Sequence, residues 1–137
     1  MTDISLKFEK HIEVKANNTL AVDLLASVTD LSKQQLKLIM QKGAVWASKG
    51  NKTLRIRRAK KALFIGQTLH IYYDPTVLEK TPPEPTLISD EFNYSVWNKP
   101  YGMLSQGSKW GDHCTITRWS EQHLSPQRTS FVVHRLD

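Results

Sequence analysis

The chain has 137 residues, 39% of them apolar and 23% charged, and carries a formal net charge of +6. This composition is ordinary for a globular protein and leaves room for one or two small domains. No apolar run approaches the roughly 18 residues of a membrane-spanning helix, and Met1-Thr2-Asp3-Ile4 lacks the basic start and apolar stretch of a signal peptide. We therefore expect a cytoplasmic protein without a membrane partner. The single cysteine, Cys114, agrees with a reducing compartment because it allows no disulfide within the chain.

The positive charge is concentrated in one segment. Residues 31–73, the acid-free segment, contain no Asp or Glu, whereas the rest of the chain has thirteen acidic and nine basic residues. A block of charged residues of one sign in a folded region is typical of polyanion binding, because a solvated face without a partner normally carries both positive and negative residues. The segment therefore predicts a nucleic-acid-binding surface. Its basic residues are Lys33, Lys37, Lys42, Lys49, Lys52, Arg55, Arg57, Arg58, Lys60 and Lys61.

The first part of the chain predicts a strand and then a helix. Apolar and polar residues alternate over residues 4–9, and Ile12 and Val14 can extend this strand within an N-terminal segment at residues 1–17. Residues 17–19 are Asn, Asn and Thr, which can cap a helix. Leucine and valine then recur at helical spacing, so we expect an amphipathic helix over residues 20–28.

A second helix has a well-defined start and end. Ser32 as N-cap and Gln35 three residues later form a capping box, and Leu31 and Leu36 can pack against each other as a hydrophobic staple. Gly43 stands where a left-handed residue commonly ends a helix. Strands are expected to follow at residues 44–47, 54–57 and 69–73, with turns at Gly50-Asn51 and Gly66-Gln67.

Two short helices followed by small strands, with lysines on the second helix, resemble the RNA-binding domain first seen in small-subunit ribosomal protein four. Residues 31–45 and 66–71 carry this resemblance, and we place the domain at residues 18–74. The chain departs from the family at residues 20–23, Leu-Ala-Val-Asp, where the family usually has Arg-Leu-Asp, and at Gly66-Gln67, where Gly-Asp is usual. The resemblance implies that the basic residues of the acid-free segment bind RNA.

A proline-rich stretch follows this domain. Pro75, Pro82, Pro83 and Pro85 predict a semi-stiff linker without regular structure at residues 75–86. Beyond it, residues 87–102 predict a strand, a turn at Asp90-Glu91 and a second strand that runs into Asn98-Lys99-Pro100.

The run Trp97-Asn98-Lys99-Pro100-Tyr101-Gly102 and the final Val133-His134-Arg135-Leu136-Asp137 resemble the two opening motifs of the catalytic domain of RluA-type RNA pseudouridine synthases. Residues 87–137 match the first segment of that domain. The resemblance implies an α+β chain: a small RNA-binding domain, a linker, and the first strands of a mixed α/β catalytic domain. We expect this catalytic domain to be incomplete here, and the chain alone to be inactive because it ends at Asp137.

By this resemblance, the chain belongs to enzymes that isomerise specific uridines of structured RNA, such as rRNA or tRNA, to pseudouridine. Asp137 would be the catalytic carboxylate, which could act as nucleophile, base or charge stabiliser. Arg135 would help to hold the RNA, and Lys99, Pro100 and Gly102 would shape a turn near the cleft. His134 would pack or hydrogen-bond at a strand end, with general base as the alternative role. The reaction implies no cofactor.

Other interpretations of the same residues concern function and metal binding. A non-catalytic RNA-binding module with a truncated synthase domain would share the first 74 residues. No common zinc spacing fits the candidate metal ligands Asp112, His113, Cys114 and His123, so we expect no bound metal. We also expect the protein to be monomeric. Three tryptophans could stack on bases, although packing is the more frequent use of such residues; these are Trp97, Trp110 and Trp119.

Overall fold

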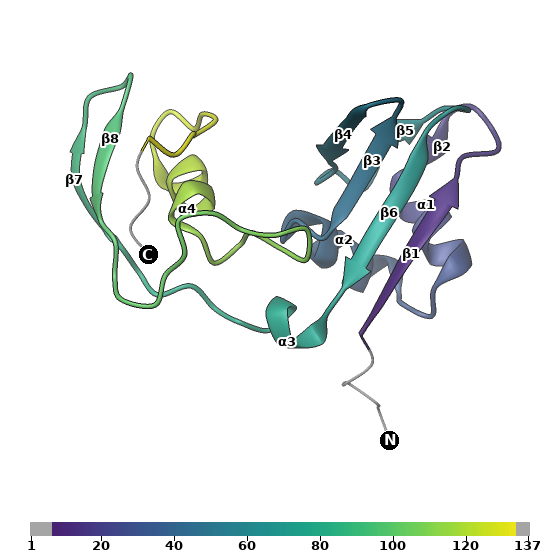
Figure 1. The fold of residues 1–137 in the computed structure, drawn as a ribbon, viewed down its shortest axis with the longest axis horizontal. Helices are drawn as coiled ribbons and strands as arrows, with labels where there is room; N and C mark the ends of the chain where they lie inside the picture. Colours follow the sequence, from purple (N-terminus) through teal and green to yellow (C-terminus); the bar gives the residue numbers. More distant parts are fainter. Residues whose placement is uncertain (1–6, 134–137) are drawn as a thin grey trace. The chain divides into compact units, whose positions relative to one another are not determined.

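The computed structural model describes residues 7–133, which form two compact units. The first unit extends to Glu79 and includes Lys109–Gly111, and the second contains Lys80–Ser108 and the residues from Asp112 onward. Helices and antiparallel strands occur in both, so the α+β class is confirmed (Figure 1). None of the helices within residues 7–133 is long and apolar enough to cross a membrane.

The first unit is built on a four-stranded antiparallel sheet in the order β1-β6-β3-β4. Two helices pack on one face of this sheet, and a second, two-stranded sheet consists of β2 and β5 (Figure 1). The strands are β1 (Phe8–Glu13), β2 (Thr19–Leu20), β3 (Val45–Lys49), β4 (Lys52–Arg55), β5 (Ala62–Leu63) and β6 (Thr68–Tyr73). The helices are α1 (Ala21–Val28) and α2 (Lys33–Gln41).

The core of the first unit lies between these helices and the sheet. Leu25 of α1 and Leu36 of α2 are fully buried, as are Val45 of β3 and Leu69 and Ile71 of β6. Burying each such side chain contributes about 1.5–3 kcal/mol, which holds α1 and α2 against β3 and β6. The expected strands at residues 44–47, 54–57 and 69–73 are present with ends shifted by at most two residues.

The two helices begin in different ways. The capping box of α2 is confirmed: Gln35 N donates to Ser32 Oγ (3.1 Å), and Ser32 N donates to Gln35 Oε1 (2.9 Å). No side chain caps α1, contrary to the expectation from residues 17–19. Its first N–H groups instead donate to main-chain carbonyls of the loop before β5, Ala21 N to Lys61 O (2.9 Å) and Val22 N to Ala59 O (3.0 Å).

The structure confirms one expectation about the flanks of the first unit and corrects another. The first strand covers Phe8–Glu13 and so includes Ile12, as expected, whereas residues 4–6 of the expected strand lie outside the described residues. Its pairing with β6 places Phe8 and Ile12 against the core. The proline-rich stretch is not irregular throughout, since a short helix, α3 (Pro75–Leu78), starts on its first proline. Proline suits the first position of a helix, where its missing N–H would have no partner. The side chain of Asp74 caps this helix by accepting from Thr76 N (3.0 Å).

The second unit, described as far as Val133, contains a hairpin and one helix. The predicted strand, turn and strand are confirmed as β7 (Thr86–Asp90) and β8 (Ser95–Asn98), which pair antiparallel. The helix α4 (Ile116–His123) was not predicted from the sequence. The side chain of Thr115 caps α4 by accepting from Arg118 N (3.1 Å).

Replacing Ser32 by Ala should lower the free energy of unfolding of the first unit by about 1 kcal/mol, because the N–H of Gln35 loses its acceptor. Urea denaturation followed by circular dichroism measures this loss. Gln34→Ala is the matched control, since Gln34 is exposed in the same helical turn and its loss should change the stability by less than about 0.5 kcal/mol. Equal losses in the two variants would contradict a stabilising role of the capping box.

Candidate nucleic-acid interface

The basic residues of the acid-free segment fall into two groups according to their exposure. Three side chains are half-buried, at Lys42, Arg55 and Arg57. The other members are exposed on α2, on the β3–β4 hairpin and on the loop before β5. They are Lys33, Lys37, Lys49, Lys52, Arg58, Lys60 and Lys61.

The half-buried cations hold main-chain carbonyls at the ends of helices. Arg55 Nε donates to Gly43 O (2.8 Å) and Arg57 Nη1 to Gln41 O (3.2 Å), both at the end of α2. Lys42 Nζ donates to Leu78 O (2.7 Å) at the end of α3. Positive groups are favourable at these positions because a helix carries partial negative charge at its C-terminus. The structure thus gives these predicted RNA-binding residues an architectural role.

The exposed cations of the loop before β5 sit on a fixed backbone. This loop carries Arg58, Lys60 and Lys61, and its carbonyls accept the hydrogen bonds that begin α1. On α2, Lys33 pairs with Asp23 of α1 (3.0 Å), with the two side chains 60% and 49% exposed. An ion pair this exposed is weak, so a phosphate can compete for the lysine. These cations form a surface suited to a phosphate backbone.

The Asn98-Lys99-Pro100-Tyr101-Gly102 run of the second unit forms a turn, as predicted. Met103 N donates to Pro100 O (3.2 Å), and Gly102 has a φ of +86°, which suits glycine in a turn. Lys99 Nζ donates to Met103 O (2.9 Å) and holds the turn closed. These contacts stabilise the turn, and they involve the residues that were expected to shape it, Lys99, Pro100 and Gly102.

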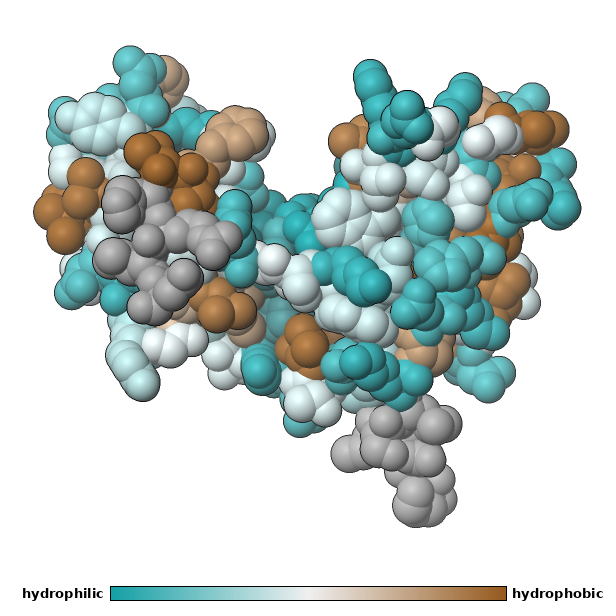
Figure 2. Space-filling model, viewed as in Figure 1, coloured by the Kyte–Doolittle hydropathy of each residue, from teal (hydrophilic) through white to brown (hydrophobic). Residues whose placement is uncertain are grey.

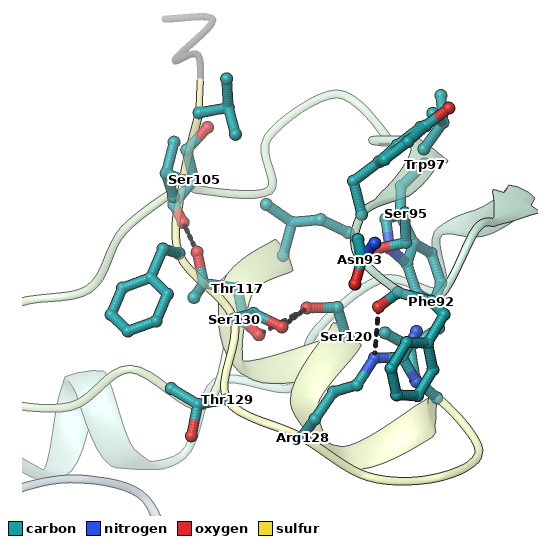
Figure 3. A pocket seen from close by; sticks show the side chains of 17 residues that line it. Phe92, Asn93, Ser95, Trp97, Ser105, Thr117, Ser120, Arg128, Thr129 and Ser130 are labelled. Atoms are coloured by element: carbon teal, nitrogen blue, oxygen red, sulfur yellow. Dashed lines mark hydrogen bonds between the residues drawn. The ribbon is translucent and has the colours of Figure 1, made fainter.

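An open groove of about 690 Å³ lies within the second unit, lined by the β7–β8 hairpin, α4 and residues 128–133. Its wall combines aromatic rings, such as Phe92 and Trp97, with small hydroxyl groups (Figure 3). Ser120 Oγ donates to Ser130 Oγ (2.8 Å). Arg128 Nε donates to Phe92 O (3.1 Å), which ties the final segment to the hairpin. Among residues 7–133, no carboxylate lines this groove.

Three of the predicted active-site residues lie outside the described part of the chain. They are the catalytic candidate Asp137 and its neighbours Arg135 and His134. The described residues end at Val133, which lines the groove.

The exposed face of the four-stranded sheet carries a polar network that the sequence did not predict. His11 Nδ1 lies 2.7 Å from His70 Nδ1, His11 Nε2 lies 2.9 Å from Glu9 Oε2, and His70 Nε2 lies 2.7 Å from Ser48 Oγ. One Nδ1 must donate and the other accept, so at least one ring is neutral. Burial, and to a smaller degree the adjacent His11, lowers the pKa of His70 below its usual 6.5.

The residues considered for a metal have other contacts. His113 Nε2 lies 2.8 Å from Lys80 O, and Cys114 Sγ donates to the same carbonyl at 3.4 Å. The ring of His123 stacks on Trp119 with centroids 3.8 Å apart. Within residues 7–133, no group of three or more His, Cys, Asp or Glu side chains is placed to hold a metal ion.

Comparison with known proteins gives no relative: no family model matches the chain, and no curated protein or solved structure is similar to it.

The histidine pair predicts acid sensitivity of the first unit. Because the pKa of His70 is lowered in the folded state, the unfolded chain binds a proton more readily below about pH 6.5. The free energy of unfolding should therefore fall as the pH drops below that value and be insensitive to this group above it. Urea denaturation at several pH values measures the trend, and His70→Gln should make it shallower. His123→Gln, an exposed histidine of the second unit, is the control, and an equal effect of both changes would refute the assignment.

Proposed function

We propose that the chain binds RNA through the first unit and belongs to a protein that converts uridine in RNA to pseudouridine. The observation that carries the RNA-binding part is the acid-free segment, whose ten basic residues include seven with exposed side chains on α2, a hairpin and a backbone-anchored loop. A folded surface rich in positive charge attracts the phosphate backbone of a nucleic acid, and the counterions condensed on the nucleic acid are released on binding. The motif resemblance favours RNA over DNA as the partner.

The proposed reaction rests on the resemblance of the two motifs. The bond between uracil N1 and the ribose C1′ breaks, and a bond from C5 to C1′ forms. The hydrogen on C5 leaves as a proton while N1 gains one, so the product has the composition of the substrate and no oxidant or reductant is consumed. The carboxylate of Asp137 would take part as the glycosidic bond loosens. The uridine must be unpaired or flipped out of a helix for any group to reach it.

The groove of the second unit supports this proposal. Its volume of about 690 Å³ falls in the range of small-molecule sites. A neutral pyrimidine suits a wall of aromatic rings and hydroxyl groups, and Arg128 at its edge is held by Asp90 and by Phe92 O. The Val133-His134-Arg135-Leu136-Asp137 run begins with a residue that lines this groove.

The second candidate function is RNA binding without catalysis. The observation that favours it is that the exposed cations of the acid-free segment all lie in the first unit. Binding through these cations requires no residue of the second unit. The two functions differ in whether uridine is consumed, which a direct assay resolves.

RNA binding is tested by neutralising exposed cations of the acid-free segment. The triple variant Lys37→Gln, Lys60→Gln, Lys61→Gln should weaken binding to structured RNA broadly across sequences. The slope of log affinity against log salt should become shallower by roughly 0.7–0.9 for each phosphate contact that is lost. Filter-binding titrations at several salt concentrations give both quantities.

The matched control removes the same charge from elsewhere. Lys10, Lys15 and Lys80 are exposed and lie outside the acid-free segment, so their joint replacement by Gln should leave the slope closer to that of the wild type. Equal effects of the two triple variants would show that net charge alone matters and would overturn the assigned surface.

Catalysis is tested by release of tritium from RNA labelled at C5 of uridine, because the proposed reaction detaches that hydrogen. The assay is carried out with the chain of 137 residues and with the whole product of its gene. Asp137→Asn should abolish release while leaving RNA affinity within about twofold, since the change removes one carboxylate far from the assigned cations in sequence. If no form releases tritium although RNA is bound, the non-catalytic function is correct. Full activity of Asp137→Asn would refute the role of Asp137.

A further inference from the structure

We propose that the exposed face of the four-stranded sheet binds unpaired RNA bases by stacking them on Trp46 and Tyr72. This inference rests on the proposed RNA binding and names a second surface for it. The pairing of β3 with β6 sets Trp46 opposite His70, and Tyr72 follows His70 by two residues. Side chains alternate along a strand, so these three rings share the face opposite to Leu69 and Ile71, which are buried under the helices.

The sheet face is rich in aromatic rings that are only partly covered. Trp46, His70 and Tyr72 are half-buried, and the ring of Trp110 meets that of Tyr72 edge to face with centroids 5.5 Å apart. Burial and Glu9 raise the pKa of the Tyr72 hydroxyl above its usual value, so the ring is uncharged at neutral pH. Figure 2 shows this side of the first unit, where the sheet lies in front of α1 and α2, mostly in teal and white. Polar atoms around flat rings suit nucleobases better than an apolar partner.

Cations lie directly on these rings. The guanidinium carbon of Arg55 is 4.2 Å from the centre of the Trp46 ring, and Lys109 Nζ is 4.8 Å from that of Tyr72. Lys7 Nζ lies 4.5 Å from the Trp110 ring. Lys7 and Lys109 are exposed, and cation–π contacts at exposed sites are weak, so a base can take the place of the Lys109 ammonium on the Tyr72 ring while the ammonium pairs with the neighbouring phosphate.

The charges on this face favour an anionic partner. The acidic groups near the rings are already paired, Glu9 with His11 (2.9 Å) and Asp74 with Lys7 (3.9 Å). Trp46, Arg55 and Tyr72 belong to the acid-free segment. Lys49 and Lys52 flank the turn that joins β3 to β4, so the same hairpin carries Trp46, Arg55 and two exposed lysines of the proposed phosphate-binding surface. A single strand of RNA supplies phosphates and accessible bases together, whereas a duplex keeps its bases stacked inside.

The proposal is tested with an oligouridylate of about 12 nucleotides, within the range of single-strand site sizes, and with an RNA duplex of the same length. Trp46→Leu and Tyr72→Leu should each weaken oligouridylate binding about five- to hundredfold. Duplex binding should change little, and the salt slope for the oligouridylate should stay the same, because no phosphate contact is removed. Phe64→Leu is the matched control, since Phe64 is an exposed aromatic residue of the same unit beyond the four-stranded sheet.

Unchanged oligouridylate affinity in both leucine variants would overturn the inference and leave the proposed function standing. If the wild type binds neither RNA, the proposed function fails and the inference fails with it. A polyglutamate peptide that binds as tightly as the oligouridylate, with the same response to the variants, would identify an acidic protein partner instead and also overturn the inference.

A second measurement on the wild type does not depend on how the variants fold. An oligouridylate with 5-iodouridine, irradiated in the complex, crosslinks to aromatic side chains in contact with its bases. Peptides that contain Trp46 or Tyr72 should carry the adducts, as mapped by mass spectrometry. Adducts confined to other peptides would refute the assignment of this face.

Discussion

The alternation of side chains along β6 determines what each face of the first unit can do. This strand lies between β1 and β3, and it buries Leu69 and Ile71 on one side while it exposes His70 and Tyr72 on the other. Shifting its register by one residue would exchange the two sets and cost the burial of the core. The apolar side of β6 packs against α1 and α2 and so positions the cations of α2. The opposite side of β6 carries the rings of His70 and Tyr72. The two proposed RNA surfaces therefore depend on one register.

The acid-free segment has to fold in spite of its own repulsion. Ten positive charges without an acid disfavour a compact state, and the structure offsets this with contacts that need no carboxylate within the segment. Arg55 and Arg57 donate to carbonyls at the negative end of α2, and Arg55 also covers the ring of Trp46. The outermost cations remain in water, where the repulsion is screened. The same arrangement leaves a field that a polyanion can neutralise, so the stability of the fold and the proposed affinity for RNA would respond to the same charges.

Local chemistry made part of this fold predictable. The ends of α2 follow from Ser32, Gln35 and Gly43, whose φ of +92° is the left-handed conformation expected after a helix. The start of α1 could not be predicted, because carbonyls some forty residues further along the chain supply its cap. Sequence alternation also shows that His70 and Tyr72 share a face, whereas their pairing with His11 requires the register of β1, which local sequence does not specify. At the candidate site, composition identified the cations but could not separate those that hold helix ends from those exposed to solvent.

Phosphate contacts and base contacts serve different ends in this arrangement. In the proposed function, the cations on α2 and the loop before β5 would bind any phosphate backbone and provide affinity without selecting a sequence. Under the proposed stacking, rings such as Trp46 and Tyr72 would hold any exposed base and so select unpaired RNA over duplex without distinguishing one base from another. Choice of a particular uridine would then require hydrogen bonds to the edges of its base, for which the groove of the second unit offers hydroxyl groups such as Ser120 and Ser130. A protein that modifies one uridine among many would thus combine unselective binding in one unit with recognition of a single base in the other.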